Sequence, residues 1–254
     1  MPSREAAQRA VADRQVTVNG ALANKPARMV LAGDAIEVLG PPPKYVGRGG
    51  DKLEGALTSF AIDPAGMRCI DVGSSTGGFT DCLLQRGAAS VVAVDVGRAQ
   101  LHDRLRRHPK VDVHEQTDIR SVDPGEIGAP FDLVVIDVSF IGLDRILHIV
   151  STLAGATGQI VALVKPQFEA GKQEASRGRG VIKDPEIWKR VLNECIAASR
   201  SRGLPVAAVD VSPIKGGAGN VEFFLLTGGA ESGLADAVDD DAVNTALERA
   251  GALP

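Results

Sequence analysis

Seven short and almost wholly apolar segments recur along the middle of this 254-residue chain. Several of the stretches between them, such as residues 143–154 and 185–201, are long enough to form helices. Nearly continuous apolar strands that alternate with helices are typical of a parallel sheet covered on both faces. The expected strands are 69–72, 90–95, 111–114, 132–136, 159–164, 205–211 and 221–226.

The last two expected strands are joined by a connection that is too short for a crossover helix. Residues 213–219 are rich in glycine and proline, so we expect a tight return and an antiparallel final pair. A plain dinucleotide-binding fold does not predict this ending. The pattern therefore favours an α/β fold with the Rossmann-like, seven-stranded sheet of class I methyltransferases, whose last strand is antiparallel.

The first 40 residues follow a different pattern, which predicts a small α+β domain. Apolar residues between 6 and 11 share one helical face, and Asn19-Gly20 is a two-residue hairpin signal between short strands. Prolines 41–43 exclude a helix and predict a stiff linker over 41–49. A main domain over 50–227 and an acidic tail over 228–254, with a short helix at 241–249, complete the expected organisation.

Composition excludes several classes of protein. The three cysteines are widely spaced, so neither a disulfide framework nor a structural zinc site is expected, and no metal is assigned. No apolar stretch reaches the roughly 18 residues of a membrane span, and no secretory signal is visible. We therefore expect a cytoplasmic protein without a membrane partner. The net charge of −4 does not decide for or against nucleic acid, because clustering on one face matters more than the sum.

A glycine-rich stretch follows the first expected strand and precedes a helix expected at 80–86. Glycines allow the backbone to approach a ligand, and the N-terminus of the following helix offers N–H groups. Alone, this turn is compatible with NAD, a phosphate, an adenosyl cofactor or no ligand. The residues of this turn that we expect to bind a cofactor are Asp71, Gly73, Ser74, Thr76, Gly77, Gly78 and Phe79.

Carboxylates also follow the next three expected strands. Asp95 could accept both ribose hydroxyls of an adenosine, and Asp118 could accept from an adenine amino group. Asp137 ends the fourth strand. One such aspartate is commonly a helix cap, but repetition along one sheet edge favours a ligand. Because the glycine spacing differs from the GxGxxG of dinucleotide enzymes, the sequence predicts S-adenosylmethionine as the cofactor, with all three aspartates among its binding residues.

Two lysines and two carboxylates are expected to converge at this edge as catalytic residues. Lys165 ends the fifth strand, Glu222 lies in the seventh, and Lys52 begins the helix that enters the domain. A lysine at the end of an apolar strand buries a costly charge unless a partner such as Asp137 balances it. Such a group could orient or deprotonate a hydroxyl acceptor, which alone is a poor nucleophile. The alternative is a purely structural ion-pair network.

The methyl acceptor is expected to be an oxygen. The Asn/Asp-Pro-Pro-Tyr/Phe pattern of amino-methylating enzymes is missing at the end of the fourth strand, where residues 137–140 read Asp-Val-Ser-Phe. Cys82 and Cys195 fall inside expected helices, so neither indicates the nucleophile of a base-C5 methyltransferase.

Basic residues occur at the front of the chain and in the loop 171–184, just after Lys165. That loop could contact phosphates, or it could be an ordinary solvated loop. Aromatic residues make up only 4% of the chain, so RNA would be recognised by shape and backbone rather than by stacking on a sheet. The expected RNA-binding residues are Arg4, Arg9, Arg14, Lys25, Arg48, Lys172, Arg177, Arg179 and Lys183.

Five segments together resemble the TlyA family, whose members are named both hemolysins and ribosomal RNA 2′-O-methyltransferases. They are 45–57, 71–80, 137–141, 165–169 and 219–222, and the resemblance extends over about residues 3–227. It implies an S4 RNA-binding domain before an FtsJ-like catalytic domain, with S-adenosylmethionine as donor and a cytidine of 16S or 23S ribosomal RNA as acceptor. The residues that match the Lys-Asp-Lys-Glu tetrad of FtsJ-like enzymes are Lys52, Asp137, Lys165 and Glu222. Because S4 domains of this family usually begin with an additional helix, we expect this one to be truncated at its first helix.

Three other functions stay open at this point. A non-catalytic RNA-binding or ribosome-assembly factor could retain the fold, although the complete tetrad argues against it. A membrane-active hemolysin would need a strongly amphipathic cationic helix, which the sequence lacks. The S4-like N-terminal region, which is typical of RNA-binding proteins, argues against a small-molecule O-methyltransferase.

Overall fold

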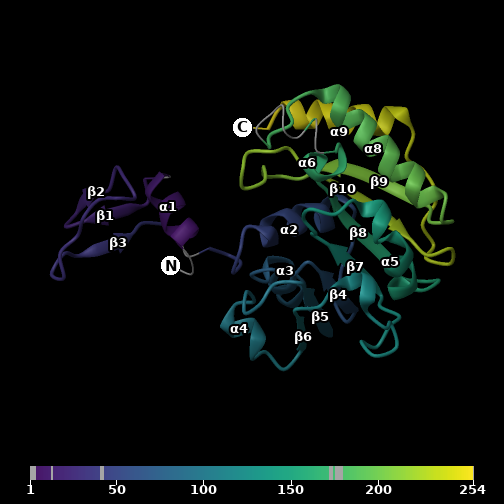
Figure 1. Ribbon diagram of the computed structural model, residues 1–254, viewed down its shortest axis with the longest axis horizontal. Helices are drawn as coiled ribbons and strands as arrows, with labels where there is room; N and C mark the ends of the chain where they lie inside the picture. Colours follow the sequence, from purple (N-terminus) through teal and green to yellow (C-terminus); the bar gives the residue numbers. More distant parts are fainter. Residues whose placement is uncertain (1–3, 13, 41–42, 172–173, 175–179, 254) are drawn as a thin grey trace. The chain divides into compact units, whose positions relative to one another are not determined.

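The computed structural model describes residues 4–12, 14–40, 43–171, 174 and 180–253. The chain divides into two compact units, Met1–Val46 and Gly47–Pro254 (Figure 1). The division falls inside the segment 41–49 that the sequence marks as a linker.

A short helix and a three-stranded antiparallel sheet form the N-terminal unit. Asn19 and Gly20 have φ angles of 54° and 78°, as a type I′ turn requires, which confirms the expected hairpin. The strand order is β2-β1-β3, and a small apolar core lies between β1 and the helix. The elements are α1 (Arg4–Ala12), β1 (Val16–Val18), β2 (Ala21–Leu22) and β3 (Ile36–Val38).

The second unit is built on a seven-stranded sheet with the strand order β6-β5-β4-β7-β8-β10-β9. Strand β10 is antiparallel to both of its neighbours, whereas β4 to β8 pair in parallel. This is the methyltransferase sheet that the sequence predicts. Its strands are β4 (Arg68–Val72), β5 (Ser90–Asp95), β6 (Val111–Glu115), β7 (Leu133–Ile136), β8 (Gln159–Val164), β9 (Val206–Val211) and β10 (Phe223–Gly228).

Helices cover both faces of this sheet, because successive strand side chains point to opposite sides. Phe223 packs in one core with α5, α8 and α9, while Phe224 contacts Phe79 of α3 on the other side. Helices α8 and α9 lie side by side near β9 (Figure 1). The helices are α2 (Gly49–Ser59), α3 (Gly78–Gln85), α4 (Asp103–Arg106), α5 (Leu147–Ala154), α6 (Pro166–Glu169), α8 (Pro185–Arg200) and α9 (Asp240–Gly251), with 3-10 turns η1 (Ile119–Ser121) and η2 (Leu143–Arg145). Within the described residues, none of them is long and apolar enough to cross a membrane.

Several expected boundaries shift by one or two residues, and three differences bear on the fold or on the expected site. The expected helix 143–154 is divided at Ile146 into η2 and α5. The expected strand 221–226 starts at Phe223, so Glu222 precedes it. The segment 228–254 is not a tail, because α9 presents Val243, Ala246 and Ala250 on one face to the core.

Candidate active site

Three of the four expected catalytic residues stand at one edge of the sheet. Asp137 follows β7, Lys165 follows β8, and Glu222 immediately precedes β10. Phe223 pairs with Val164 in the antiparallel ladder, so Glu222 and Lys165 occupy the next opposed positions beyond it. The expected convergence at this edge is therefore built into the strand register.

The four expected catalytic residues form two ion pairs, Lys52–Glu222, which is buried, and Lys165–Asp137, in which the aspartate is half-buried. Lys52, in the first turn of α2, places Nζ 2.5 Å from Glu222 Oε2. Lys165 Nζ contacts Asp137 Oδ1 and lies 3.1 Å from Ser139 Oγ. Lys52 and Lys165 are each 8% exposed and Glu222 is 3% exposed, so each buried charge has an opposite charge beside it.

Glu222 is also held by its other oxygen. The Gln167 amide donates from Nε2 to Glu222 Oε1 at 3.2 Å. A Cβ on Gly216 would lie 2.5 Å from that oxygen, so the backbone of the loop between β9 and β10 packs directly against the Glu222 carboxylate and leaves no space for a side chain at position 216. Gln167 Oε1 is buried and has no hydrogen-bond partner among the described residues. Gln167 was not among the residues expected from the sequence, although it lies within the segment 165–169 that carries the resemblance.

The glycine-rich turn joins β4 to α3, as expected. Asp71 is fully buried, and its Oδ2 accepts from the backbone N–H and the hydroxyl of Thr80 at 2.9 and 2.6 Å. Burial raises the pKa of Asp71 to about 7, against the lowering effect of the Thr80 hydroxyl. Gly73 has a φ of +87°, and a Cβ there would lie 2.5 Å from the carbonyl oxygen of Asp137. The turn is thus fixed both to α3 and to the end of β7.

Other residues of the turn serve mainly in packing. Phe79 is 2% exposed and its ring packs on Phe224, so its side chain belongs to the core. A Cβ on Gly77 would meet Leu101 and Leu105, and one on Gly78 would meet the backbone of α2. Ser74 is buried, and Thr76 is exposed.

The two strand-end aspartates beyond the turn have different partners. Each oxygen of Asp95 accepts one backbone N–H, from Ser75 at 2.8 Å and from Gly97 at 2.6 Å. Asp118 instead caps η1 and forms an ion pair with Arg120 at 2.5 Å, whose hydrogen bonds lower the pKa of Asp118. Asp118 therefore has the cap role that a lone strand-end aspartate commonly plays.

Glu115 at the end of β6 is a further carboxylate at this edge, and it was not among the residues expected from the sequence. Its oxygens accept the backbone N–H groups of Ala99, Gln100 and Leu101, and they bind Arg106 at 2.6 Å. The hydrogen bond from Arg106 is the main reason that the pKa of Glu115 is lowered to about 2. Glu115 thus fixes the loop that follows Asp95, and its place at a strand end was the only sequence signal for it.

Asn220 fixes the end of the basic loop 171–184 close to Glu222. It is 2% exposed, its Oδ1 accepts from Ile182 N–H at 2.9 Å, and its Nδ2 donates to the Gly180 carbonyl at 2.8 Å. The sequence analysis quoted Asn220 within the segment 219–222 without assigning it a role. The structure makes it the link between that loop and the start of β10.

The expected RNA-binding residues are spread over both units. Arg48 is half-buried and donates to the carbonyl oxygen of Lys215. Arg4 and Arg9 belong to α1, Arg14, Lys25 and Lys183 are exposed, and Lys172, Arg177 and Arg179 lie outside the described residues.

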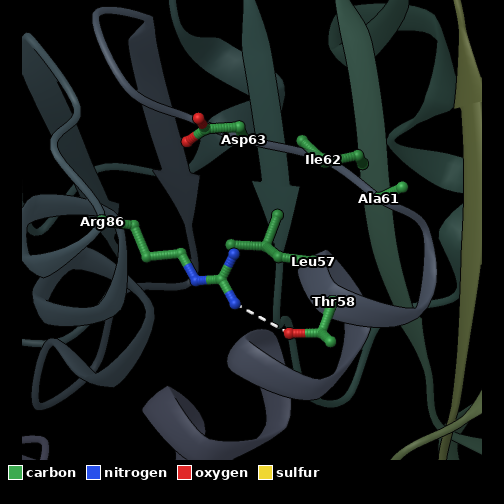
Figure 2. Close-up of a pocket in the computed structure, with 6 residues that line it drawn as sticks. All are labelled: Leu57, Thr58, Ala61, Ile62, Asp63 and Arg86. Carbon is green, nitrogen blue, oxygen red and sulfur yellow. Dashed lines mark hydrogen bonds between the residues drawn. The ribbon is translucent and has the colours of Figure 1, made fainter.

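A separate concavity of about 560 Å³ lies at the C-terminal ends of α2 and α3 (Figure 2). Arg86 projects into it, donates to Thr58 Oγ1 at 2.7 Å and is bound to Glu54. None of the expected catalytic or cofactor-binding residues lines it: the lining residues are Leu57, Thr58, Ala61, Ile62, Asp63 and Arg86. No cluster of three or more His, Cys, Asp or Glu that could hold a metal occurs in the described part of the chain.

Comparison with known proteins agrees with this geometry. Residues 45–229 match the FtsJ-like methyltransferase family and residues 2–36 match the S4 domain. The Mycobacterium tuberculosis protein named 16S/23S rRNA (cytidine-2′-O)-methyltransferase TlyA is 44% identical over 224 residues, which cover 88% of this chain and 83% of that one. Hemolysin A of Brachyspira hyodysenteriae is 37% identical, with 87% and 92% covered. A solved Streptococcus thermophilus structure, described as a candidate hemolysin, matches with a TM-score of 0.82 at 38% identity, with 99% and 91% covered. The chain therefore belongs to the FtsJ-like methyltransferase family, and within it to the TlyA group with an N-terminal S4 domain.

Proposed function

We propose that this protein transfers a methyl group from S-adenosylmethionine to a ribose 2′-hydroxyl of ribosomal RNA. The observation that carries the proposal is the presence of two ion pairs, the buried Lys52–Glu222 and the partly buried Lys165–Asp137, at one sheet edge. Relatives named 16S/23S or 23S rRNA (cytidine-2′-O)-methyltransferase support ribosomal RNA as substrate and cytidine as target. The cytoplasm, where ribosomal subunits occur, is the proposed compartment.

The residues around the glycine-rich turn fit an adenosyl cofactor. Each carboxylate oxygen of Asp95 accepts one backbone N–H, from Ser75 or from Gly97, which leaves lone pairs for the two hydroxyls of a ribose. Asp71 Oδ1, in β4 two residues before Gly73, is buried without a hydrogen-bond partner among the described residues. We assign cofactor binding to Asp95 and to the backbone of residues 73–78. When bound, the cofactor supplies a methyl carbon that a sulfonium sulfur already activates.

The ion pairs would prepare the hydroxyl that accepts the methyl group. An alcohol is a weak nucleophile, so its oxygen must be oriented and its proton must leave as the new bond forms. Lys165, held by Asp137 and Ser139, can donate a hydrogen bond to that oxygen and fix its direction. The carboxylates of Asp137 and Glu222 are acceptors for the departing proton. Alignment of this kind is the main contribution that the protein has to make.

An aromatic pair stands beside Lys165. Phe140 is 90% exposed, its ring centroid lies 4.8 Å from that of Phe168, and Lys165 Nζ lies 5.8 Å from the Phe168 ring. Single-stranded RNA is commonly recognised by stacking of unpaired bases on exposed aromatic rings. The pair supports an extruded nucleotide as acceptor, even though the chain has few aromatic residues.

Transfer of radiolabel from S-adenosylmethionine to ribosomal subunits tests the proposal. Subunits from a strain that lacks the methyltransferase should be labelled in their RNA by the wild type and by Lys110→Ala, which changes an exposed lysine outside the site. Lys165→Ala should lose the activity. Equal labelling by Lys165→Ala would refute the role of the ion pairs, and label in protein or small molecules would refute the RNA substrate. RNA binding without transfer by the wild type would favour an assembly factor, and red-cell lysis without transfer would favour a hemolysin.

A further inference from the structure

The loop after β7 (residues 137–143) is attached to residues 165–169 at successive points along its length. At its start, Lys165 binds both Asp137 and Ser139. In its middle, Phe140 packs against Phe168. At its end, Glu169 Oε1 accepts the backbone N–H of Leu143 at 2.9 Å. The segment that carries Lys165 therefore holds the loop that carries Asp137, and Glu169 closes the far end.

This loop contains a strained residue. Phe140 has a φ of +67°, a left-handed conformation that is costly for a bulky side chain. Its side chain is 90% exposed, so burial of the ring does not compensate for that cost. A residue keeps such a conformation only when its surroundings fix the backbone, and strained residues of this kind concentrate at functional sites. Lys165 holds the loop before Phe140 through the side chains of Asp137 and Ser139, and Glu169 holds the backbone after it at Leu143 N–H.

Glu169 occupies an unfavourable place for a carboxylate. It is half-buried, and burial together with the nearby carboxylates of Asp144 and Glu194 raises its pKa to about 7. No lysine or arginine forms an ion pair with it in the part of the chain that the structure describes. A glutamine would fit the same space without a charge, so stability alone does not explain a glutamate here. Such a costly group beside an active site indicates a functional role.

We propose that Glu169 is a positioning residue for methyl transfer, whose hydrogen bond to Leu143 N–H holds the loop 137–143 so that Ser139 and Phe140 stand beside Lys165 where the acceptor nucleotide binds. This inference rests on the proposed function. It assigns Glu169 no contact with the reacting atoms. Its effect should appear in the use of RNA and not in the binding of the cofactor, because the residues assigned to the cofactor lie at β4 and β5.

The test compares Glu169→Ala, Glu169→Gln and Glu194→Gln in the full chain, with radiolabelled S-adenosylmethionine and unmethylated ribosomal subunits. Glu194→Gln removes a neighbouring carboxylate without touching Leu143, so it is the matched control. Loss of a hydrogen bond to a charged group should reduce kcat/KM for subunits at least about tenfold in Glu169→Ala. Glu169→Gln keeps an acceptor oxygen and should recover most of that loss. Glu194→Gln and the cofactor Kd of all three variants should stay within about twofold of the wild type.

A double variant distinguishes positioning from a general loss of structure. If Glu169 acts through the loop, Glu169→Ala should reduce kcat/KM little further when Phe140→Ala is already present, because the two changes remove the same arrangement. Full activity of Glu169→Ala would overturn the inference. So would multiplicative losses in the double variant, a Glu169→Gln variant as impaired as Glu169→Ala, or a parallel loss of cofactor binding. Absence of RNA labelling by the wild type would instead refute the proposed function.

Discussion

Variants of Lys52 and Glu222 can separate the contribution of this ion pair to stability from its contribution to methyl transfer. Lys52→Met would leave Glu222, 3% exposed, with only the neutral Gln167 amide as a side-chain partner among the described residues. Removing one partner of a buried ion pair costs about 3–5 kcal/mol. We expect a loss of about 3 kcal/mol in the free energy of unfolding, at the lower end because the hydrogen bond from Gln167 persists. The double variant Lys52→Met, Glu222→Gln buries no charge and should lie within about 1 kcal/mol of the wild type.

Urea unfolding followed by tryptophan fluorescence measures this difference. The chain has a single tryptophan, Trp188, which is buried and lies 6.0 Å from the Phe223 ring, next in sequence to Glu222. Its emission therefore reports on the second unit. Losses that add in the double variant would show that Lys52 and Glu222 are not coupled and would refute the reasoning.

The same variants decide between an ion-pair network and a catalytic role. A network that serves only stability predicts that the double variant, with its stability recovered, also recovers methyl transfer. The proposed chemistry predicts that the single and the double variant both stay inactive, because neither retains Lys52 together with the Glu222 carboxylate. A double variant that is both stable and active would show that the Lys52–Glu222 pair has no catalytic role.

Three further predictions concern the glycine-rich turn, the half-buried carboxyl group of Glu169 and the cofactor. Gly73→Ala should destabilise the protein by about 2–4 kcal/mol, because it adds a Cβ 2.5 Å from the Asp137 carbonyl oxygen at a φ of +87°. The control Gly66→Ala, at a φ of +76° with nothing within 4 Å of the new Cβ, should cost only about 1 kcal/mol. Urea unfolding measures both losses, and equal losses would contradict the clash at Gly73. The raised pKa of Glu169, about 7, means that its stabilising effect is complete below the unfolded value of 4.5 and is lost as the pH rises through 7. The free energy of unfolding of Glu169→Gln minus that of the wild type should therefore be roughly 2 kcal/mol larger at pH 8 than at pH 5, a value that is reduced for partial exposure. Thermal unfolding at the two pH values measures this difference. A difference that stays constant over this range would contradict the raised pKa. Asp95→Asn should raise the Kd for S-adenosylmethionine about tenfold or more in calorimetry. Asp118→Asn keeps an oxygen that can cap η1 and loses only the charge of the ion pair with Arg120, so it should change that Kd less than about threefold; the opposite ranking would move the adenosine site towards β6.

The sequence predicted the sheet and its edge because both depend on local patterns. Buried parallel strands are largely apolar, and Asp95 and Asp137 are each visible as the first polar residue after such an apolar run. Lys165 could be paired with Asp137 because successive strands of this kind are often neighbours. These inferences needed only periodicity and the rule that parallel strands end at a common edge.

Hydrogen bonds from side chains to loop backbone could not be predicted in the same way. Glu115, Glu169 and Asn220 each bind N–H groups of a loop distant in sequence, and no periodicity marks a residue for such a role. The core position of the Phe79 side chain was hidden for a different reason: a phenylalanine beside glycines fits a ligand turn and a core position equally well. Packing against Phe224 decides between them, and that contact depends on the tertiary fold.

The antiparallel direction of β10 explains why a glutamate that precedes a strand can meet a lysine that follows one. In a parallel strand, the residue before the first pair lies at the amino edge of the sheet, opposite the site. Because β10 runs the other way, with Phe223 opposite Val164, its beginning lies at the carboxyl edge where β8 ends. A shift of the β10 register by one residue would turn Glu222 to the opposite face of the sheet and separate it from Lys52. Ser212 N–H donates to the Glu222 carbonyl at 2.9 Å and Gly216 N–H to the Asn220 carbonyl at 2.8 Å, so the Gly/Pro-rich connection 213–219 helps to hold β10 in the register that the ion pairs need.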